Sequence, residues 1–138
     1  MAADLERAGL RLDVAATGLP AVIQGSWDHL SEVMQNLLDN ARKFSPQGGT
    51  VCIRVDASGA DAIVSVSDQG IGVSAEKLPQ LFERFYQADA GVTRRFGGMG
   101  LGLALVREIV IAHRGRVWAE SPGEGAGFTV SFAIPVVT

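Results

Sequence analysis

The stretch Asn36-Leu-Leu-Asp-Asn-Ala-Arg-Lys-Phe-Ser45 carries two overlapping patterns, and the first of them predicts a helix. From Trp27 to Phe44, apolar side chains recur every three or four residues, as in an amphipathic helix packed on a core. Ser26 is suited to cap the start of this helix, and Pro46 to end it. The apolar stripe consists of Trp27, Leu30, Met34, Leu37, Ala41 and Phe44.

The second pattern is polar. Asn36, Asn40 and Lys43 are spaced so that they project from one side of the helix, beside the apolar arc. An amide oxygen can ligate Mg²⁺, which usually binds few protein groups together with phosphates. A lysine one turn further on could meet the same phosphates as a point charge. By itself the stripe also fits an ordinary solvated helix face.

Around this helix the sequence alternates between strand and helix signals. Strands are expected at 10–15, 21–24, 50–56, 62–67, 116–121 and 128–134. Short helical turns are expected at 75–80 and 81–86, and a buried helix at 100–113, capped by Gly115. We therefore predict an α/β fold, a two-layer sandwich in which a mixed sheet of about five strands carries three helices on one face.

Length and composition exclude several classes of protein. With 138 residues, 47% of them hydrophobic and 20% charged, the chain suits one globular domain. A net charge of −3 does not fit a protein that binds nucleic acid. The longest uncharged stretches, 14–27 and 125–138, are too short to span a membrane, so no direct membrane contact is expected. The single cysteine, Cys52, fits a cytoplasmic location and is expected to be a small buried thiol.

Two glycine-rich segments could hold a ligand. Asp68-Gln-Gly-Ile-Gly72 follows an expected strand, where a carboxylate could accept from an exocyclic amine; a plain glycine turn is the alternative. Gly97-Gly-Met-Gly-Leu-Gly-Leu103 opens the helix at 100–113, where free N–H groups attract anions such as phosphates. Its spacing matches neither a dinucleotide-binding motif nor a P-loop, and a flexible hinge is the alternative.

The segment between these two stretches contributes further candidates. Leu81-Phe-Glu-Arg-Phe85 places two aromatic rings on one face of a turn, either in the core or at the start of a mobile loop. Arg94 and its neighbour, in the loop 87–98, could close on phosphates or be surface charge. The two histidines, His29 and His113, lack metal-ligand neighbours, so both are expected to be structural.

In order and spacing, these segments resemble the catalytic and ATP-binding domain of sensor histidine kinases, within the superfamily that includes gyrase B subunits, heat-shock chaperones and mismatch-repair ATPases. Residues 36–45 look like the N box, 68–72 like the first glycine box, 81–85 like the F box and 98–103 like the second glycine box. By this resemblance residues 10–138 would form the catalytic domain, and residues 1–9 would be a linker remnant.

The resemblance implies a role for each matching residue. Asn40 would ligate Mg²⁺, Asn36 would lie close to the phosphates, and Lys43 would reach a phosphate oxygen. Asp68 would accept from the adenine amine. Asn36, Lys43 and Arg94 would act in catalysis. The other residues implied to bind ATP are Phe44, Ile71, Gly72, Phe85, Gly98, Gly100, Leu101, Gly102 and Leu103.

Three departures from the family pattern bear on function. Met99 stands where Thr or Ser is common. Ala126 and Gly127 stand where many members carry a hydroxyl that supports the aspartate. No phosphoacceptor histidine motif precedes the domain, and neither histidine has that context.

The function implied is binding of ATP with Mg²⁺ and transfer of the γ-phosphoryl group to a histidine on separate dimerisation helices. A response regulator would act downstream, and the parent kinase could be membrane-anchored. Two alternatives stay open: a non-catalytic ATP-sensing or docking module, and a serine kinase of the anti-sigma type. The second group typically carries an acidic residue where Asn36 stands here. Because an amide cannot be a general base, efficient ATP hydrolysis is not expected.

Overall fold

The computed structural model describes residues 10–18, 21–57, 59–83, 102–123 and 125–137. Its elements follow the order β1 (Leu10–Thr17), α2 (Trp27–Lys43), β2 (Gly49–Asp56), β3 (Asp61–Asp68), a 3-10 turn (Leu78–Gln80), α4 (Gly102–Ala112), β4 (Arg116–Glu120) and β5 (Phe128–Pro135). The strands form one sheet in the order β1-β2-β3-β5-β4. The β1–β2 pair is parallel and the other pairs are antiparallel, which confirms the predicted mixed sheet.

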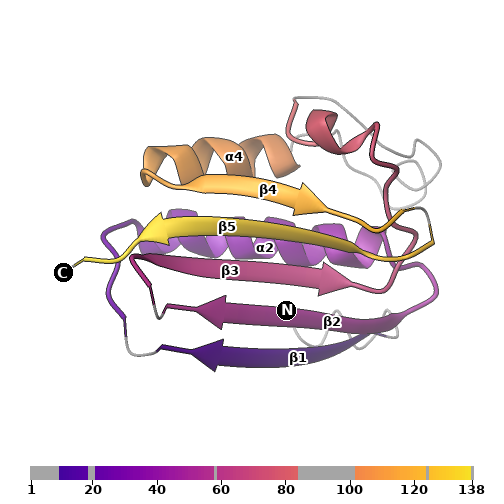
Figure 1. Ribbon diagram of the computed structural model, residues 1–138, viewed down its shortest axis with the longest axis horizontal. Helices are drawn as coiled ribbons and strands as arrows, with labels where there is room; N and C mark the ends of the chain where they lie inside the picture. The colour runs from indigo at the N-terminus through magenta and orange to yellow at the C-terminus, as the bar shows by residue number, and fades with distance from the viewer. Residues whose placement is uncertain (1–9, 19–20, 58, 84–101, 124, 138) are drawn as a thin grey trace.

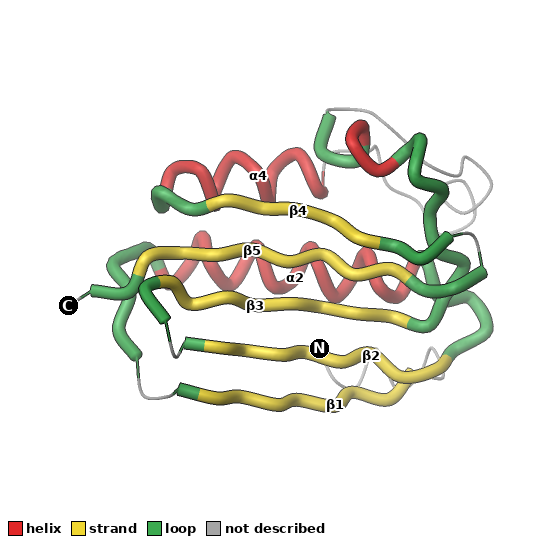
Figure 2. The backbone as a smooth tube through the Cα atoms, viewed as in Figure 1, coloured by secondary structure: helices red, strands yellow, loops and turns green. Residues whose placement is uncertain are grey.

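Both helices lie on one face of this sheet, α2 behind β3 and β5 and α4 beside β4 (Figures 1 and 2). The buried core lies between the two layers. It contains Val33, Leu37, Leu38 and Ala41 of α2, five residues of α4, and the inward-facing residues of β2, β3 and β5 such as Val51, Val66, Val130 and Phe132. The two-layer α/β prediction is therefore confirmed.

The helix α2 follows the predicted boundaries. The side chain of Ser26 accepts the N–H of His29 at 3.3 Å, which confirms the predicted cap. Trp27, however, is 82% exposed instead of buried. It is the first helical residue and lies about 60° from the centre of the buried arc, counting 100° per residue. The indole therefore borders an apolar groove beside Leu30 and Met34.

The end of α4 differs from the prediction at Gly115. The residue with a left-handed backbone is Arg114, with φ 64°, whereas Gly115 is not among the residues with positive φ. A Cβ on Gly115 would collide with the carbonyl oxygen of Ala133. The glycine is therefore required because β5 approaches closely, and not because the helix cap needs its conformational freedom.

Two further predictions are corrected by the structure, at 21–24 and at Cys52. Residues 21–24 form no strand, only an isolated bridge between Ile23 and Val136. The short helical turn predicted at 75–80 is confirmed in part by the 3-10 turn Leu78–Gln80, whereas residues 84–86 lie outside the described residues, so the structure describes two α-helices. Cys52 is exposed, because it alternates with buried Val51 and so points to the sheet face that the helices leave open. No helix in the described part of the chain is long and apolar enough to cross a membrane.

Candidate functional site

Three segments predicted to carry function are brought together along α2. The C-cap residue of α2, Phe44, accepts the N–H of Ile71 through its carbonyl oxygen at 2.8 Å. A Cβ on Gly70 would collide with that same carbonyl. On the other side, a Cβ on Gly102 would lie 3.3 Å from Oδ1 of Asn36. The end of α2 therefore packs on the glycine loop after β3, and its middle packs on the start of α4.

The carboxyl group of Asp68 lies at the end of β3 and is only 8% exposed. Burial raises its pKa from an ordinary value near 3.8 to about 6, and backbone N–H groups of Gly70 and Phe128 partly offset this shift. The bond from the Gly70 N–H to Oδ1 is 2.9 Å long. A buried acceptor with such a pKa is suited to accept from an amine on a bound base.

The glycine loop after β3 has little room for side chains. Gly72 has φ 68°, and a Cβ there would collide with the carbonyl oxygen of Gly123. In this structure Gly72 therefore leaves room for the main chain of the loop between β4 and β5. Gly127 has φ 85°, and a Cβ there would lie 2.5 Å from the carbonyl oxygen of Asp68. In this conformation a side chain at position 127 would press on the main chain of Asp68.

The polar stripe of α2 is partly exposed along its length. The amide nitrogen of Asn36 donates to the carbonyl oxygen of Glu32 at 3.0 Å, which leaves its amide oxygen on the side of Gly102. Asn40 and Lys43 lie one and two turns further toward the glycine loop. Amide oxygens beside a helix start suit Mg²⁺ bound together with phosphates. No group of three His, Cys, Asp or Glu side chains in the described ranges could hold a metal by itself.

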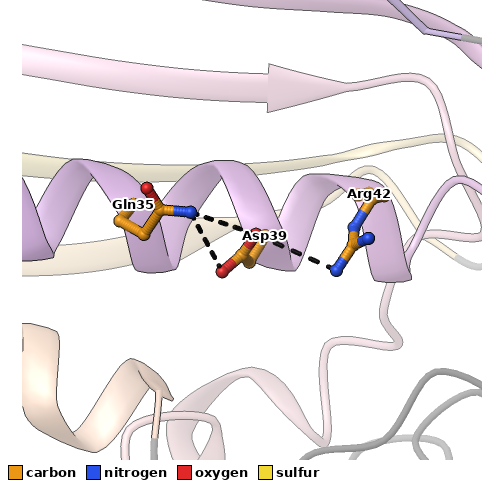
Figure 3. A network of polar contacts seen from close by, with 3 residues as sticks. All are labelled: Gln35, Asp39 and Arg42. Carbon is orange, nitrogen blue, oxygen red and sulfur yellow. Dashed lines mark hydrogen bonds and ion pairs between the residues drawn. The ribbon is translucent and has the colours of Figure 1, made fainter. Parts of the chain in front are cut away.

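The side chains of a second polar row on α2, Gln35, Asp39 and Arg42, contact one another (Figure 3). The amide of Gln35 donates to both oxygens of Asp39, at 3.4 and 3.5 Å, and the guanidinium of Arg42 lies 3.9 Å from the same carboxylate. Asp39 and Arg42 therefore belong to the N-box stretch, but their side chains make contacts within the helix on this flank. The spacing of Asn36, Asn40 and Lys43 already leaves both residues outside the predicted ligand-facing stripe.

The remaining predicted residues divide into two groups. Phe44 packs on the core, with its ring centroid 5.8 Å from that of Phe128. Gly102 begins α4, and Leu103 is buried in the core. The other members, Phe85, Arg94, Gly98, Gly100 and Leu101, lie outside the described residues.

One residue of this region was missed by the sequence analysis. The hydroxyl of Ser121 accepts the N–H of Val73 at 3.0 Å and bonds the carbonyl oxygen of Gly127 at 2.7 Å. It thereby joins the loop between β4 and β5 to the glycine loop that follows Asp68. The sequence around it, Ser-Pro-Gly, signals a turn and gives no indication of this contact.

Comparison with known proteins agrees with this geometry. Residues 25–138 match the family model described as histidine kinase-, DNA gyrase B-, and HSP90-like ATPase. The sensor histidine kinase WalK of Bacillus subtilis is 42% identical over 110 residues, covering 78% of this chain and 18% of that protein. The phosphate regulon sensor protein PhoR of Pseudomonas aeruginosa is 42% identical over 128 residues, covering 91% of this chain and 29% of that protein.

Solved structures show the same likeness. The mycobacterial sensor histidine kinase MprB superposes with a TM-score of 0.81 at 28% identity, covering 97% of this chain and 91% of that chain. Full-length ShkA, solved in complex with AMPPNP, superposes with a TM-score of 0.84 at 29% identity, covering all of this chain and 28% of that one. This chain thus spans less than a third of the curated relatives it matches. The chain belongs to the histidine kinase-, DNA gyrase B-, and HSP90-like ATPase family, as an ATP-binding catalytic domain of the sensor histidine kinase type.

Proposed function

We propose that this domain binds ATP with Mg²⁺ and transfers the γ-phosphoryl group to a histidine on separate dimerisation helices. The observation that carries the proposal is the position of Asp68. Its buried carboxylate lies beside a loop that hydrogen-bonds to the end of α2, whose polar stripe leads from there to the start of α4. A base acceptor and a set of phosphate- and metal-binding groups thus lie along one helix.

At the base end, the Asp68 carboxylate accepts a hydrogen bond from the exocyclic amine of adenine. The N–H of Gly70 holds one carboxylate oxygen, which fixes the orientation of the group. Ile71 and Phe44 line this end, and their main chains are held together by a 2.8 Å hydrogen bond. Burial keeps water from competing for the carboxylate, so one hydrogen bond discriminates strongly between bases.

At the phosphate end, Asn40 would hold Mg²⁺ through its amide oxygen, and Asn36 and Lys43 would contact the phosphate oxygens. The ion, when bound, supplies positive charge that neutralises the phosphates. Backbone N–H groups at the start of α4, around Gly102 and Leu103, bind phosphate oxygens. The resemblance implies that Phe85, Gly98, Gly100 and Leu101 also bind ATP, and that Arg94 would bring a guanidinium to the phosphates.

The chemistry proposed is an in-line transfer. An imidazole nitrogen of the acceptor histidine forms a bond to the γ-phosphorus as the bond to the β,γ-bridging oxygen breaks, and ADP leaves with the electron pair. The protein mainly positions the reactants and stabilises charge. Water is a poor competitor for this transfer because the amide of Asn36 cannot remove its proton.

The partners follow from the reaction. The acceptor is a helix pair of the parent kinase, and a response regulator receives the phosphoryl group afterwards. The names of the relatives support this assignment, because WalK and PhoR are sensor proteins and ShkA was crystallised with an ATP analogue. Since ATP is the substrate, we place the domain in the cytoplasm.

The test is a titration of the domain with ATP, with and without Mg²⁺, beside the Asp68→Asn variant. We expect saturable binding that Mg²⁺ strengthens and the substitution removes. Binding that is absent at millimolar ATP, or unaffected by Asp68→Asn, would contradict the assignment of the site. Addition of histidine-bearing helices from a relative with γ-labelled ATP then tests transfer. Acid-labile label on the helices supports histidine as the acceptor, and acid-stable label indicates serine.

A further inference from the structure

The hydroxyl of Ser121 uses all of its hydrogen-bonding capacity. A serine hydroxyl has one proton to donate and two lone pairs that accept. The Ser121 oxygen accepts the N–H of Val73 at 3.0 Å and the N–H of Gly123 at 3.2 Å. Its proton has two acceptors within reach, the carbonyl oxygens of Gly127 at 2.7 Å and Gly123 at 3.1 Å. Ser121 follows β4 directly, so it lies at the point where the chain leaves the sheet.

The two segments that Ser121 joins are held together along their length. The N–H of Gly125 donates to the carbonyl oxygen of Ile71 at 2.5 Å, and the N–H of Gly127 donates to that of Gly70 at 3.2 Å. These bonds connect backbone to backbone, and Ser121 supplies the contact at the Val73 end through its side chain. Of these connections, the Ser121 contact is the one that a side-chain substitution removes without altering a glycine.

These joined segments meet at Asp68. The backbone of Gly127 packs on the carbonyl oxygen of Asp68 so closely that no Cβ fits between them. From the other segment, the N–H of Gly70 donates to the Asp68 carboxylate at 2.9 Å. One segment therefore contacts the main chain of Asp68 and the other contacts its carboxylate, so their relative spacing bears on how the carboxylate is oriented.

We propose that Ser121 is a positioning residue for base recognition: its hydroxyl fixes the spacing of the two segments and thereby orients the Asp68 carboxylate. This inference rests on the proposed role of Asp68 as the adenine acceptor. It predicts that loss of the hydroxyl weakens the binding of the adenine base and has little effect on the binding of the phosphates. A role limited to stability would weaken the fold without changing which base is bound.

The experiment compares Ser121→Ala with Ser121→Thr, which keeps a hydroxyl, and with Ser131→Ala as a matched control. Ser131 is also buried and hydrogen-bonded, to Ser65 at 2.8 Å, but it lies in the middle of β5 away from the loops. Affinities for ATP, GTP and adenosine are measured by calorimetry for each folded variant. Protection of the Val73 amide against hydrogen exchange reports directly on the contact.

For Ser121→Ala we expect roughly a tenfold loss of ATP affinity, the order that one lost hydrogen bond supports. Adenosine is expected to lose the same factor, and the preference for ATP over GTP to narrow. Ser121→Thr should retain the affinity for ATP and the preference for ATP over GTP. Ser131→Ala should leave these two quantities unchanged. Val73 protection should fall in Ser121→Ala alone.

The inference is overturned if Ser121→Ala unfolds at lower temperature but keeps the ATP affinity and the ATP-to-GTP ratio of the unaltered chain. If Ser121→Ala does not fold, Ser121→Cys provides the comparison, because a thiol of similar size is a weaker acceptor. Unchanged base preference in that variant likewise contradicts the inference. Failure of the proposed function is recognised separately, because the unaltered chain would then not bind ATP.

Discussion

The Nε2 atom of His113 accepts the backbone N–H of Ser26 at 3.0 Å, so the residue that follows α4 closes the start of α2. Its Nδ1 atom lies 2.8 Å from the carbonyl oxygen of Ile109, which fixes Nδ1 as the protonated nitrogen. Gly25 packs against the ring, where a Cβ would approach to 2.5 Å. The two helices thus run antiparallel, with the end of α4 bonded to the start of α2 and the start of α4 packed beside Asn36 in its middle.

His113→Leu should therefore destabilise the domain by about 1–2 kcal/mol, because the N–H of Ser26 loses its partner. Chemical denaturation with urea measures this difference. His29→Leu is the control, since this ring is exposed and its side chain makes no contact of this kind in the described ranges. Equal effects of the two substitutions would show that the bond to Ser26 contributes nothing.

The buried Asp68 predicts a particular dependence of stability on pH. Because its folded pKa of about 6 lies above the ordinary value, the folded state holds this proton longer than the unfolded state does. Its contribution to stability is therefore present at pH 4 and is lost as the pH rises through 6, by up to about 3 kcal/mol. Urea titrations at several pH values give the free energy of unfolding of the unaltered chain and of Asp68→Asn. The free energy should fall with rising pH in the unaltered chain relative to the variant, and an equal dependence on pH in both would contradict a buried carboxyl at Asp68.

The same group predicts the pH dependence of nucleotide binding, with the opposite sign. Only the ionised carboxylate accepts from the adenine amine without a competing proton, so ATP affinity should fall as the pH drops below about 6. Calorimetric titrations between pH 5 and pH 8 measure this midpoint. An affinity that is constant over that range would remove Asp68 from the base site.

Gly127→Ala should destabilise the domain by more than about 2 kcal/mol. The residue has φ 85°, and the added Cβ would press on the carbonyl oxygen of Asp68. Gly59→Ala is the matched control, because nothing lies within 4 Å of the added atom and the backbone is not left-handed. Thermal unfolding compares the two, and a Gly127→Ala variant as stable as the control would contradict the close approach.

Asn40→Ala should remove most of the strengthening of ATP binding by Mg²⁺ while leaving binding without the ion nearly unchanged. The control is Gln35→Ala, on the flank of α2 where the side chain contacts Asp39. Titrations with ATP in the presence of Mg²⁺ and in the presence of a chelator give the ratio of the two affinities for each variant. If Mg²⁺ strengthens binding equally in both variants, the ion is held by other groups.

Much of this architecture could be predicted because its signals are local. The cap at Ser26, the apolar spacing that ends near Phe44, and the alternation in β2 and β3 are properties of neighbouring residues. Such patterns follow from helix and strand geometry without knowledge of what packs where. The position of Asp68 at the end of a strand could be predicted for the same reason.

What the sequence did not reveal depends on contacts between distant segments. Ser121 meets Val73 across 48 residues, and His113 meets Ser26 across 87. The sequence predicts Gly115 as a helix cap, whereas the contact that requires the glycine is with Ala133 of β5. The error at Cys52 has a different cause: the usual burial of cysteines favours a buried thiol, whereas the local strand alternation places Cys52 on the open face.

The order of strands in the sheet has a consequence for how the domain is made. β5 is the last strand in the sequence, yet it lies between β3 and β4 and pairs with both. Asp68 pairs with Phe128 in this ladder, so its strand has no neighbour on that side until β5 exists. Contacts between segments so far apart form slowly. During synthesis on the ribosome, the chain therefore carries an incomplete sheet until residues 128–135 emerge, and until then Asp68 lacks the strand that pairs with it.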